Sequence, residues 1–108
     1  MSLLTDVRES VPIASDDDAF DKDLLRYINS TLTVAKQLGV PLKANRVSMD
    51  SEWSDVVDLD AYPMFEDYLC SKVRLKFDPP LATSALEALQ KNISELEWRL
   101  NAEAENMG

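Results

Sequence analysis

The sequence predicts an all-α protein, a small bundle of about four helices with one long irregular loop between the second and third. Two observations lead to this prediction. Apolar residues recur at three- and four-residue steps in several separate segments, as they do along the buried face of a helix. Prolines and a glycine stand between these segments, at positions where helices end. The chain has 108 residues, so we expect residues 1–108 to form a single helical domain.

Composition places the chain among ordinary globular proteins. Hydrophobic residues make up 45% and charged residues 29%, which favours neither disorder nor insertion in a membrane. No apolar run approaches the roughly 20 residues that a membrane span needs. The first ten residues lack the basic and apolar regions of a signal peptide, so we expect a cytoplasmic protein.

The first helix is expected over Ser2–Val11, with Ser2 as its cap and Pro12 at its end. An acidic stretch, Ser15–Asp23, follows. It lacks the glycine turn and the final glutamate of an EF-hand, so a calcium loop is not expected. Asp16 to Asp18 are instead candidate caps for the second helix, because acidic groups stabilise the positive end of a helix dipole.

The second helix is predicted from about Asp18 to Leu38. Gly39 is placed to end it in the left-handed conformation, and Val40 is placed to make the accompanying apolar contact. The segment Pro41–Leu59 has no sustained period and is expected to be the long loop, which in general is either functional or mobile. Its scattered acids show no recognisable metal cage, so they are expected to be solvated.

The third helix is predicted to begin at Asp60 or Ala61, with Pro63 in its first turn, and to be the most buried helix. Its end leaves two interpretations open, because Lys72–Phe77 alternates as a strand does. A helix up to Leu75–Phe77 is favoured, since a lone six-residue strand has no partner.

The last helix follows the break at Pro79-Pro80, with Ser84 and Glu87 as a capping box, and is expected to continue to about Ala104. Its apolar residues form a narrow a/d seam at heptad spacing: Leu86, Leu89, Ile93, Leu96 and Leu100. Trp98 occupies the f position, which points away from this seam.

The residues that usually carry chemistry are scarce. There is no histidine, and the single cysteine, Cys70, excludes an intrachain disulfide and is expected to be a buried, inert thiol. Two glycines leave little room for phosphate-binding loops, and the net charge of −9 disfavours binding to nucleic acid. We therefore expect no enzyme, no catalytic residue, no cofactor and no metal site.

Three groups of residues are candidates for a partner interface. Trp98 is the first, since a tryptophan that is exposed on the single chain and buried by a partner is a typical hot spot of an interface. Arg99 and Asn101 beside it would supply polar contacts at the rim. The alternative is that Trp98 belongs to the core. Trp53 is the second candidate, although it could equally attach the loop to its own bundle. The third is the basic cluster of Lys72, Arg74 and Lys76, which would either meet an acidic partner or balance nearby acids.

The order of these segments resembles a known family. The tail KVRLKFDPP…ALEALQKNISELEWRLN, together with LLTDVRESVPI and DxxLLRYINSTLTVAKQLG, is similar to the small helical head–tail connectors of tailed bacteriophages, of the gp-six adaptor type. The resemblance covers nearly the whole chain, and its motifs are structural rather than catalytic.

This resemblance implies a structural virion protein. Its members form a homo-oligomeric ring, commonly dodecameric, beneath the portal protein in the neck of the particle. The ring extends the DNA channel, through which DNA passes without specific binding, and carries neck or tail-completion proteins; before assembly the subunit would reside in the host cytoplasm. The alternative function is a small acidic helical module that regulates or caps a basic protein partner. No membrane partner is expected under either hypothesis.

Overall fold

Four α-helices form the framework of the computed structural model, which describes residues 2–12 and 18–107. They are α1 (Leu3–Ser10), α2 (Asp21–Gln37), α3 (Phe65–Phe77) and α4 (Thr83–Met107), with short 3₁₀ turns η2 (Asp18–Phe20) and η3 (Trp53–Asp55). The all-α prediction is confirmed, and the loop between α2 and α3 is irregular apart from η3. None of the described helices is long and apolar enough to cross a membrane.

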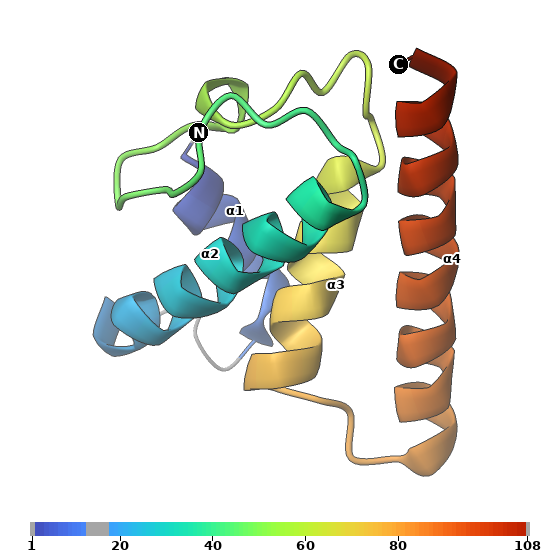
Figure 1. The fold of residues 1–108 in the computed structure, drawn as a ribbon. Coiled ribbons are helices and arrows are strands. Elements are labelled where there is room, and N and C mark those ends of the chain that lie inside the picture. The colour runs from blue at the N-terminus through green and yellow to red at the C-terminus, as the bar shows by residue number, and fades with distance from the viewer. Residues whose placement is uncertain (1, 13–17, 108) are drawn as a thin grey trace.

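Helix α3 lies at the centre of the bundle. It packs against α1 and α2 on one side and against α4 on the other, so α2 and α4 flank it (Figure 1). Its buried side chains are Phe65, Tyr68, Leu69 and Val73. The third helix is therefore central, as predicted, but it is not the most buried one: four of its 13 residues are buried, against six of 17 in α2.

Helix α2 ends as its sequence predicts. Gly39 has a φ of +99°, which costs a glycine little and other residues much more. Its N–H donates to the Lys36 carbonyl, and the N–H of the buried Val40 donates to the Ala35 carbonyl. This is the Schellman arrangement, in which two otherwise unpaired carbonyls of the last turn find donors. A methyl group at Gly39 would lie 3.3 Å from Ala104 Cβ, so the absent side chain also makes room for α4.

The N-terminal helix is attached to the bundle by charge as well as by its apolar stripe. Ser2 caps α1 by accepting a hydrogen bond from the N–H of Thr5. The Arg8 guanidinium donates twice to the carboxylate of Asp21, at 2.6 and 3.2 Å. Asp21 is nearly buried, and a buried carboxylate needs such a partner. The expected caps Asp16 and Asp17 lie outside the described residues, and Asp18 begins η2 instead of capping α2.

The long loop is held to the rest of the molecule at several points. The Trp53 indole N–H donates to the Asp6 carboxylate at 2.7 Å, and the Leu3 N–H donates to the Ser51 carbonyl at 3.0 Å. Val56 and Val57 are buried in the common core. The loop thus forms one layer of the fold and covers α1.

The predicted start of helix α3 is wrong, whereas its predicted end is correct. Helix α3 begins at Phe65, not at Asp60 or Ala61, because the Asp58 carboxylate accepts hydrogen bonds from the N–H groups of both residues and holds them in a separate turn. Pro63 therefore precedes the helix. At its other end α3 continues to Phe77, which confirms the helical interpretation over the strand.

Helix α4 also differs from its predicted limits. It begins at Thr83, and the Ala82 carbonyl accepts its first hydrogen bond, so Ser84 lies inside the first turn and does not form the predicted capping box. The helix continues past Ala104 to Met107.

Candidate partner interface

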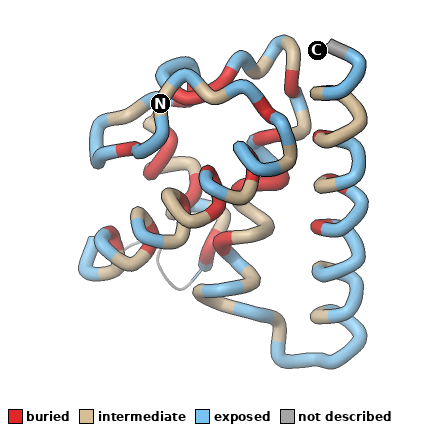
Figure 2. The backbone as a smooth tube through the Cα atoms, in the orientation of Figure 1, coloured by how far each residue is buried: buried red, intermediate tan, exposed pale blue. Residues whose placement is uncertain are grey.

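The seam of α4 is buried along its C-terminal part. Ile93, Leu96 and Leu100 are at most 6% exposed, whereas Leu86 and Leu89 are half-buried (Figure 2). The seam therefore attaches α4 to the bundle mainly through its second half. This attachment determines which side of the helix is left free.

Trp98 lies on the free side. Its side chain is 71% exposed, which is unusual for the largest apolar residue and excludes a place in the core of the single chain. It lines a shallow hollow of about 340 Å³ together with Met64, Glu95, Ala102 and Glu103. We call these residues, with Arg99, the Trp98 face. An aromatic ring with carboxylates around it is suited to a partner that carries cations.

The polar residues expected beside Trp98 have different roles. Arg99 lines the same hollow and donates to the Glu95 carboxylate at 2.7 Å; both side chains are about half exposed. Asn101 instead points toward the bundle, where its amide donates to the Leu38 carbonyl at 2.7 Å. Asn101 thus holds α4 against the end of α2 and does not lie at the rim of the Trp98 face.

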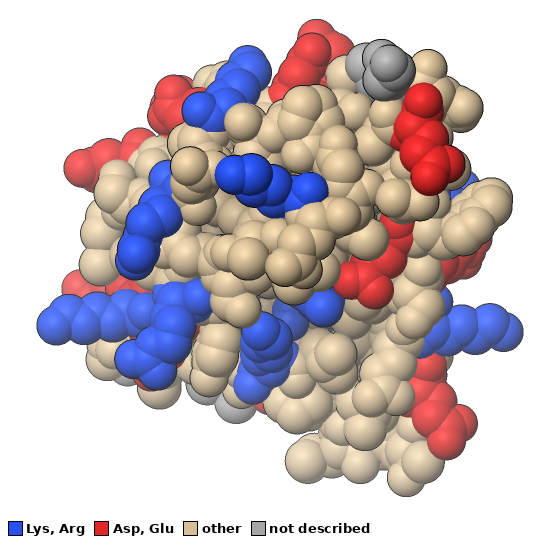
Figure 3. All heavy atoms as spheres, viewed as in Figure 1, with Lys and Arg blue, Asp and Glu red and all other residues tan. Residues whose placement is uncertain are grey.

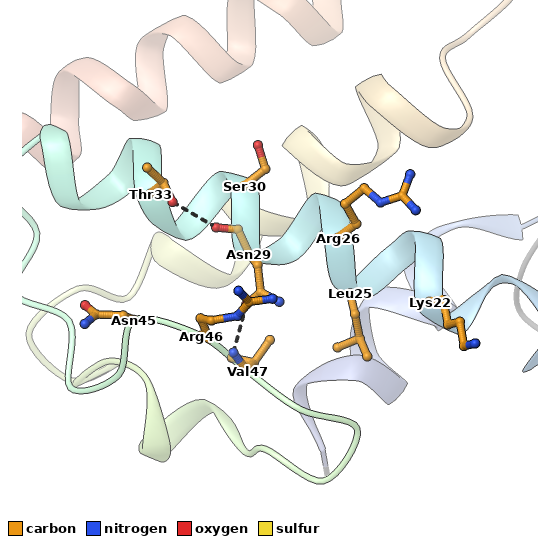
Figure 4. Close-up of a pocket in the computed structure, with 9 residues that line it drawn as sticks. All are labelled: Lys22, Leu25, Arg26, Asn29, Ser30, Thr33, Asn45, Arg46 and Val47. Carbon is orange, nitrogen blue, oxygen red and sulfur yellow. Dashed lines mark hydrogen bonds between the residues drawn. The ribbon is translucent and has the colours of Figure 1, made fainter.

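A second face, on α2, gathers positive charge. Lys22 and Arg26 on the helix and Arg46 on the loop line an open hollow of about 500 Å³ (Figure 4). Two further cations reach its walls: Lys36 Nζ lies 3.4 Å from the Asn45 amide oxygen, and Lys76 Nζ lies 3.0 Å from Ser30 Oγ. We call this region, with its five cations, the cationic hollow.

The cationic hollow stands out against the overall charge of the chain. Lys and Arg side chains gather over α2 and the neighbouring loop in Figure 3, although the chain as a whole carries −9. Among the described residues that line the hollow none is acidic. Asp23 lies 3.9 Å from Arg26, but both side chains are well exposed, so water weakens the pairing. The hollow is therefore a local concentration of positive charge on a molecule of negative net charge.

Comparison with known proteins gives the family. The model for phage connector proteins matches residues 3–107, which is almost the whole chain. The chain belongs to the phage connector protein family. No curated protein and no solved structure matches it.

The connector's second tryptophan is not available to a partner in the single chain. Trp53 is 7% exposed, and its indole N–H is satisfied by Asp6. Of the two interpretations that its sequence allowed, attachment of the loop to its own bundle is the one that the structure shows.

The basic cluster expected on α3 is divided by the helix. Lys72 is largely covered and lies 3.5 Å from the Glu97 carboxylate on α4, whereas Lys76 reaches Ser30 on α2. Arg74 is exposed between them. Residues spaced two apart, as Lys72, Arg74 and Lys76 are, would share one face of a strand. On a helix the same spacing points them in different directions. The three residues do not form one patch.

Glu97 is the centre of a small polar network between α3 and α4. It accepts one hydrogen bond from the Tyr68 hydroxyl, at 2.8 Å, and pairs with Lys72. Burial and the neighbouring carboxylate both raise the pKa of Tyr68, so its phenol stays protonated as a donor. This network orients α4 on α3 and thereby orients the Trp98 face.

The connector's surface offers little for chemistry. Burial raises the pKa of the Cys70 thiol to about 11, which disfavours the reactive thiolate. Within residues 2–12 and 18–107, no three histidine, cysteine or acidic side chains come together in a way that could hold a metal. Two faces of contrasting character, one aromatic and one cationic, stand out on the part of the surface that the structure describes.

The cationic hollow is not visible in the sequence. Lys22 and Arg26 are one turn apart on α2 and could have been noticed as a pair, but Arg46 is 20 residues away in the loop. The Val47 N–H donates to the Asn29 side chain at 2.8 Å and so holds that part of the loop beside α2. Tertiary contacts of this kind, including that of Lys36 with Asn45, bring the cations together.

Proposed function

We propose that the protein is a subunit of a ring that sits beneath the portal of a tailed phage, extends the DNA channel and joins the head to the tail. The observation that carries the proposal is the exposed Trp98 on the outer side of a well-anchored helix in a chain of the connector family. An aromatic residue held this way is a feature of partner surfaces rather than of a free monomer.

The way α4 is held fits such a role. Its seam, the Glu97 network and the bond from Asn101 to Leu38 fix its orientation on the bundle. A pre-oriented interface loses less conformational entropy when it binds. We propose that the Trp98 face meets a neighbouring protein in the neck, either another copy of the connector or a different neck component.

The acidic balance also suits a channel that DNA must pass. A net charge of −9 repels phosphates, so the wall of the proposed ring would not grip the duplex. The same charge keeps the subunit soluble in the host cytoplasm before assembly. The alternative of a small acidic module for a basic partner has less support, because the cationic hollow interrupts the acidic surface such a module would need.

The proposal is tested by mixing the purified chain with the portal of the same phage and measuring the mass of the products. We expect the wild-type chain to join the portal as a ring of many copies. Trp98→Ala should keep the helical circular dichroism of the wild type but fail to join. Met49→Ala, which also shortens an exposed apolar side chain, should join normally.

Two results would contradict the proposal. A wild-type chain that never associates with the portal would remove the neck assignment. A Trp98→Ala variant that is folded and joins the portal as well as the wild type would remove the Trp98 face from the interface.

A further inference from the structure

The two faces of contrasting character are complementary to one another. The Trp98 face presents an exposed indole beside Glu103 and beside Glu95, which is paired with Arg99, and the cationic hollow presents Arg26 and Arg46 around an open depression. Guanidinium groups stack on aromatic faces and pair with carboxylates, so one kind of residue in the hollow can make both contacts.

The two faces also lie on different sides of the molecule. Helix α3 packs between α2 and α4, and each outer helix buries its apolar side toward the bundle (Figure 1). The hollow lies along the outer side of α2 and Trp98 lies on the outer side of α4. One copy therefore cannot satisfy its own hollow with its own tryptophan.

Two different faces that meet between identical copies make a heterologous contact, and such contacts repeat from copy to copy. We propose that the cationic hollow of one copy receives Trp98, with Glu95 and Glu103, from the next copy, and that this contact joins neighbouring subunits head to tail. The inference rests on the proposed ring and names the surfaces that close it.

Charge favours a second copy as the occupant. Of the eleven cations in the chain, five surround the hollow, so the other surfaces carry most of the 20 acids with few cations to balance them. On α4 alone there are five glutamates and two cations. In a ring, a neighbouring copy is always present at high local concentration. Its α4 carries an excess of acids, whereas the hollow carries an excess of cations. A DNA duplex, in contrast, would bring its phosphates toward a chain of strongly negative net charge.

The experiment uses two variants that each lose one face. Arg26→Glu/Arg46→Glu reverses the hollow and keeps the Trp98 face. Trp98→Ala removes the aromatic anchor and keeps the hollow. Self-association is measured by analytical ultracentrifugation over a concentration series that reaches the millimolar range.

We expect the wild type to self-associate, and each variant alone to associate at least about tenfold more weakly, which corresponds to roughly 1.4 kcal/mol. Mixed together, the two variants should form a one-to-one complex that grows no further, because the mixture has one intact contact per pair. Lys43→Glu/Arg74→Glu reverses two exposed cations outside both faces and should associate as the wild type does.

Three results would overturn the pairing. The first is a mixture that stays monomeric while the wild type associates. The second is a wild type that remains monomeric at millimolar concentration. The third is binding of a short DNA duplex at physiological salt that Arg26→Glu/Arg46→Glu abolishes, since the hollow would then be a nucleic-acid surface. If the wild-type chain still joins the portal in any of these cases, the proposed function stands and only the subunit contact is wrong.

Discussion

The Asn101 amide nitrogen lies 2.7 Å from the carbonyl oxygen of Leu38 and donates a hydrogen bond to it. Leu38 follows the last residue of α2, where carbonyls have no partner inside the helix. The bond therefore completes the end of α2 with a side chain from α4. Together with the close approach of Gly39 to Ala104, it holds the two outer helices at one end of the bundle.

Asn101→Ala should lower the free energy of unfolding by about 1–2 kcal/mol, because it removes the donor of a partly buried bond and leaves the Leu38 carbonyl less well satisfied. Urea unfolding followed by circular dichroism measures the change. Asn92→Ala is the matched control, since Asn92 is exposed on the same helix and should matter little. Equal stabilities for the two variants would contradict the role of Asn101.

Gly39→Ala should cost about 1–2 kcal/mol, because a residue with a Cβ is strained at a φ of +99° and its methyl group would lie 3.3 Å from Ala104 Cβ. The double variant Gly39→Ala/Ala104→Gly separates the two causes. It relieves the contact but not the backbone strain, and it adds a helical glycine, so it should not recover wild-type stability. Thermal unfolding measures the stability of both variants. Full recovery of stability in the double variant would mean that the contact with Ala104, and not backbone strain, causes the loss.

Trp53→Phe should lower the free energy of unfolding by about 1–2 kcal/mol, since it keeps the aromatic packing but removes the indole N–H that donates to Asp6. Trp98→Phe is the control, because its side chain is exposed and makes no comparable internal bond among the described residues. Chemical denaturation of both variants tests the difference. Destabilisation by Trp98→Phe alone would reverse the assigned roles of the two tryptophans.

Tyr68 should make stability fall in alkaline solution. The pKa of Tyr68 is raised in the folded chain, chiefly by burial and then by Glu97, so the unfolded chain loses this proton first. The contribution is complete below about pH 10, the ordinary pKa of tyrosine, and decreases as pH rises above that value. Its slope is at most about 1.4 kcal/mol per pH unit.

The measurement compares urea unfolding of wild type and Tyr68→Phe between neutral pH and pH above 10. The variant should lose stability less steeply than the wild type in that range. Identical slopes would show that the Tyr68 phenol ionises in the folded chain as easily as in the unfolded one.

Much of the fold follows from local sequence patterns. Ser2, Gly39 and the Pro79-Pro80 break act on neighbouring residues, and they place helix ends close to where the structure has them. The start of α3 differs from the prediction because the Asp58 carboxylate accepts hydrogen bonds from the N–H groups of Asp60 and Ala61 and holds these residues in a turn before the helix. That competition depends on a side-chain position that no periodicity reveals.

In the candidate interface, too, some features follow from local sequence and others depend on tertiary contacts. The heptad spacing on α4 was enough to separate Trp98 from the seam, since the angle between two positions on one helix is a local property. Asn101 lies close to Trp98 in sequence but belongs to the contact with α2, and Trp53 belongs to the contact with α1. Which polar or aromatic residue faces inward depends on the neighbouring elements.

The helical class, the C-terminal ends of α1, α2 and α3 and the orientation of Trp98 away from the seam can be predicted from the sequence, because they depend on residues within a turn or two of each other. The tertiary structure alone decided that Lys72 and Lys76 reach different helices and that Arg46 joins Lys22 and Arg26 around one hollow. These groups come from distant segments, and only packing brings them together. Trp98 on α4 was thus visible from the sequence, whereas the cationic hollow that we propose to receive it was not.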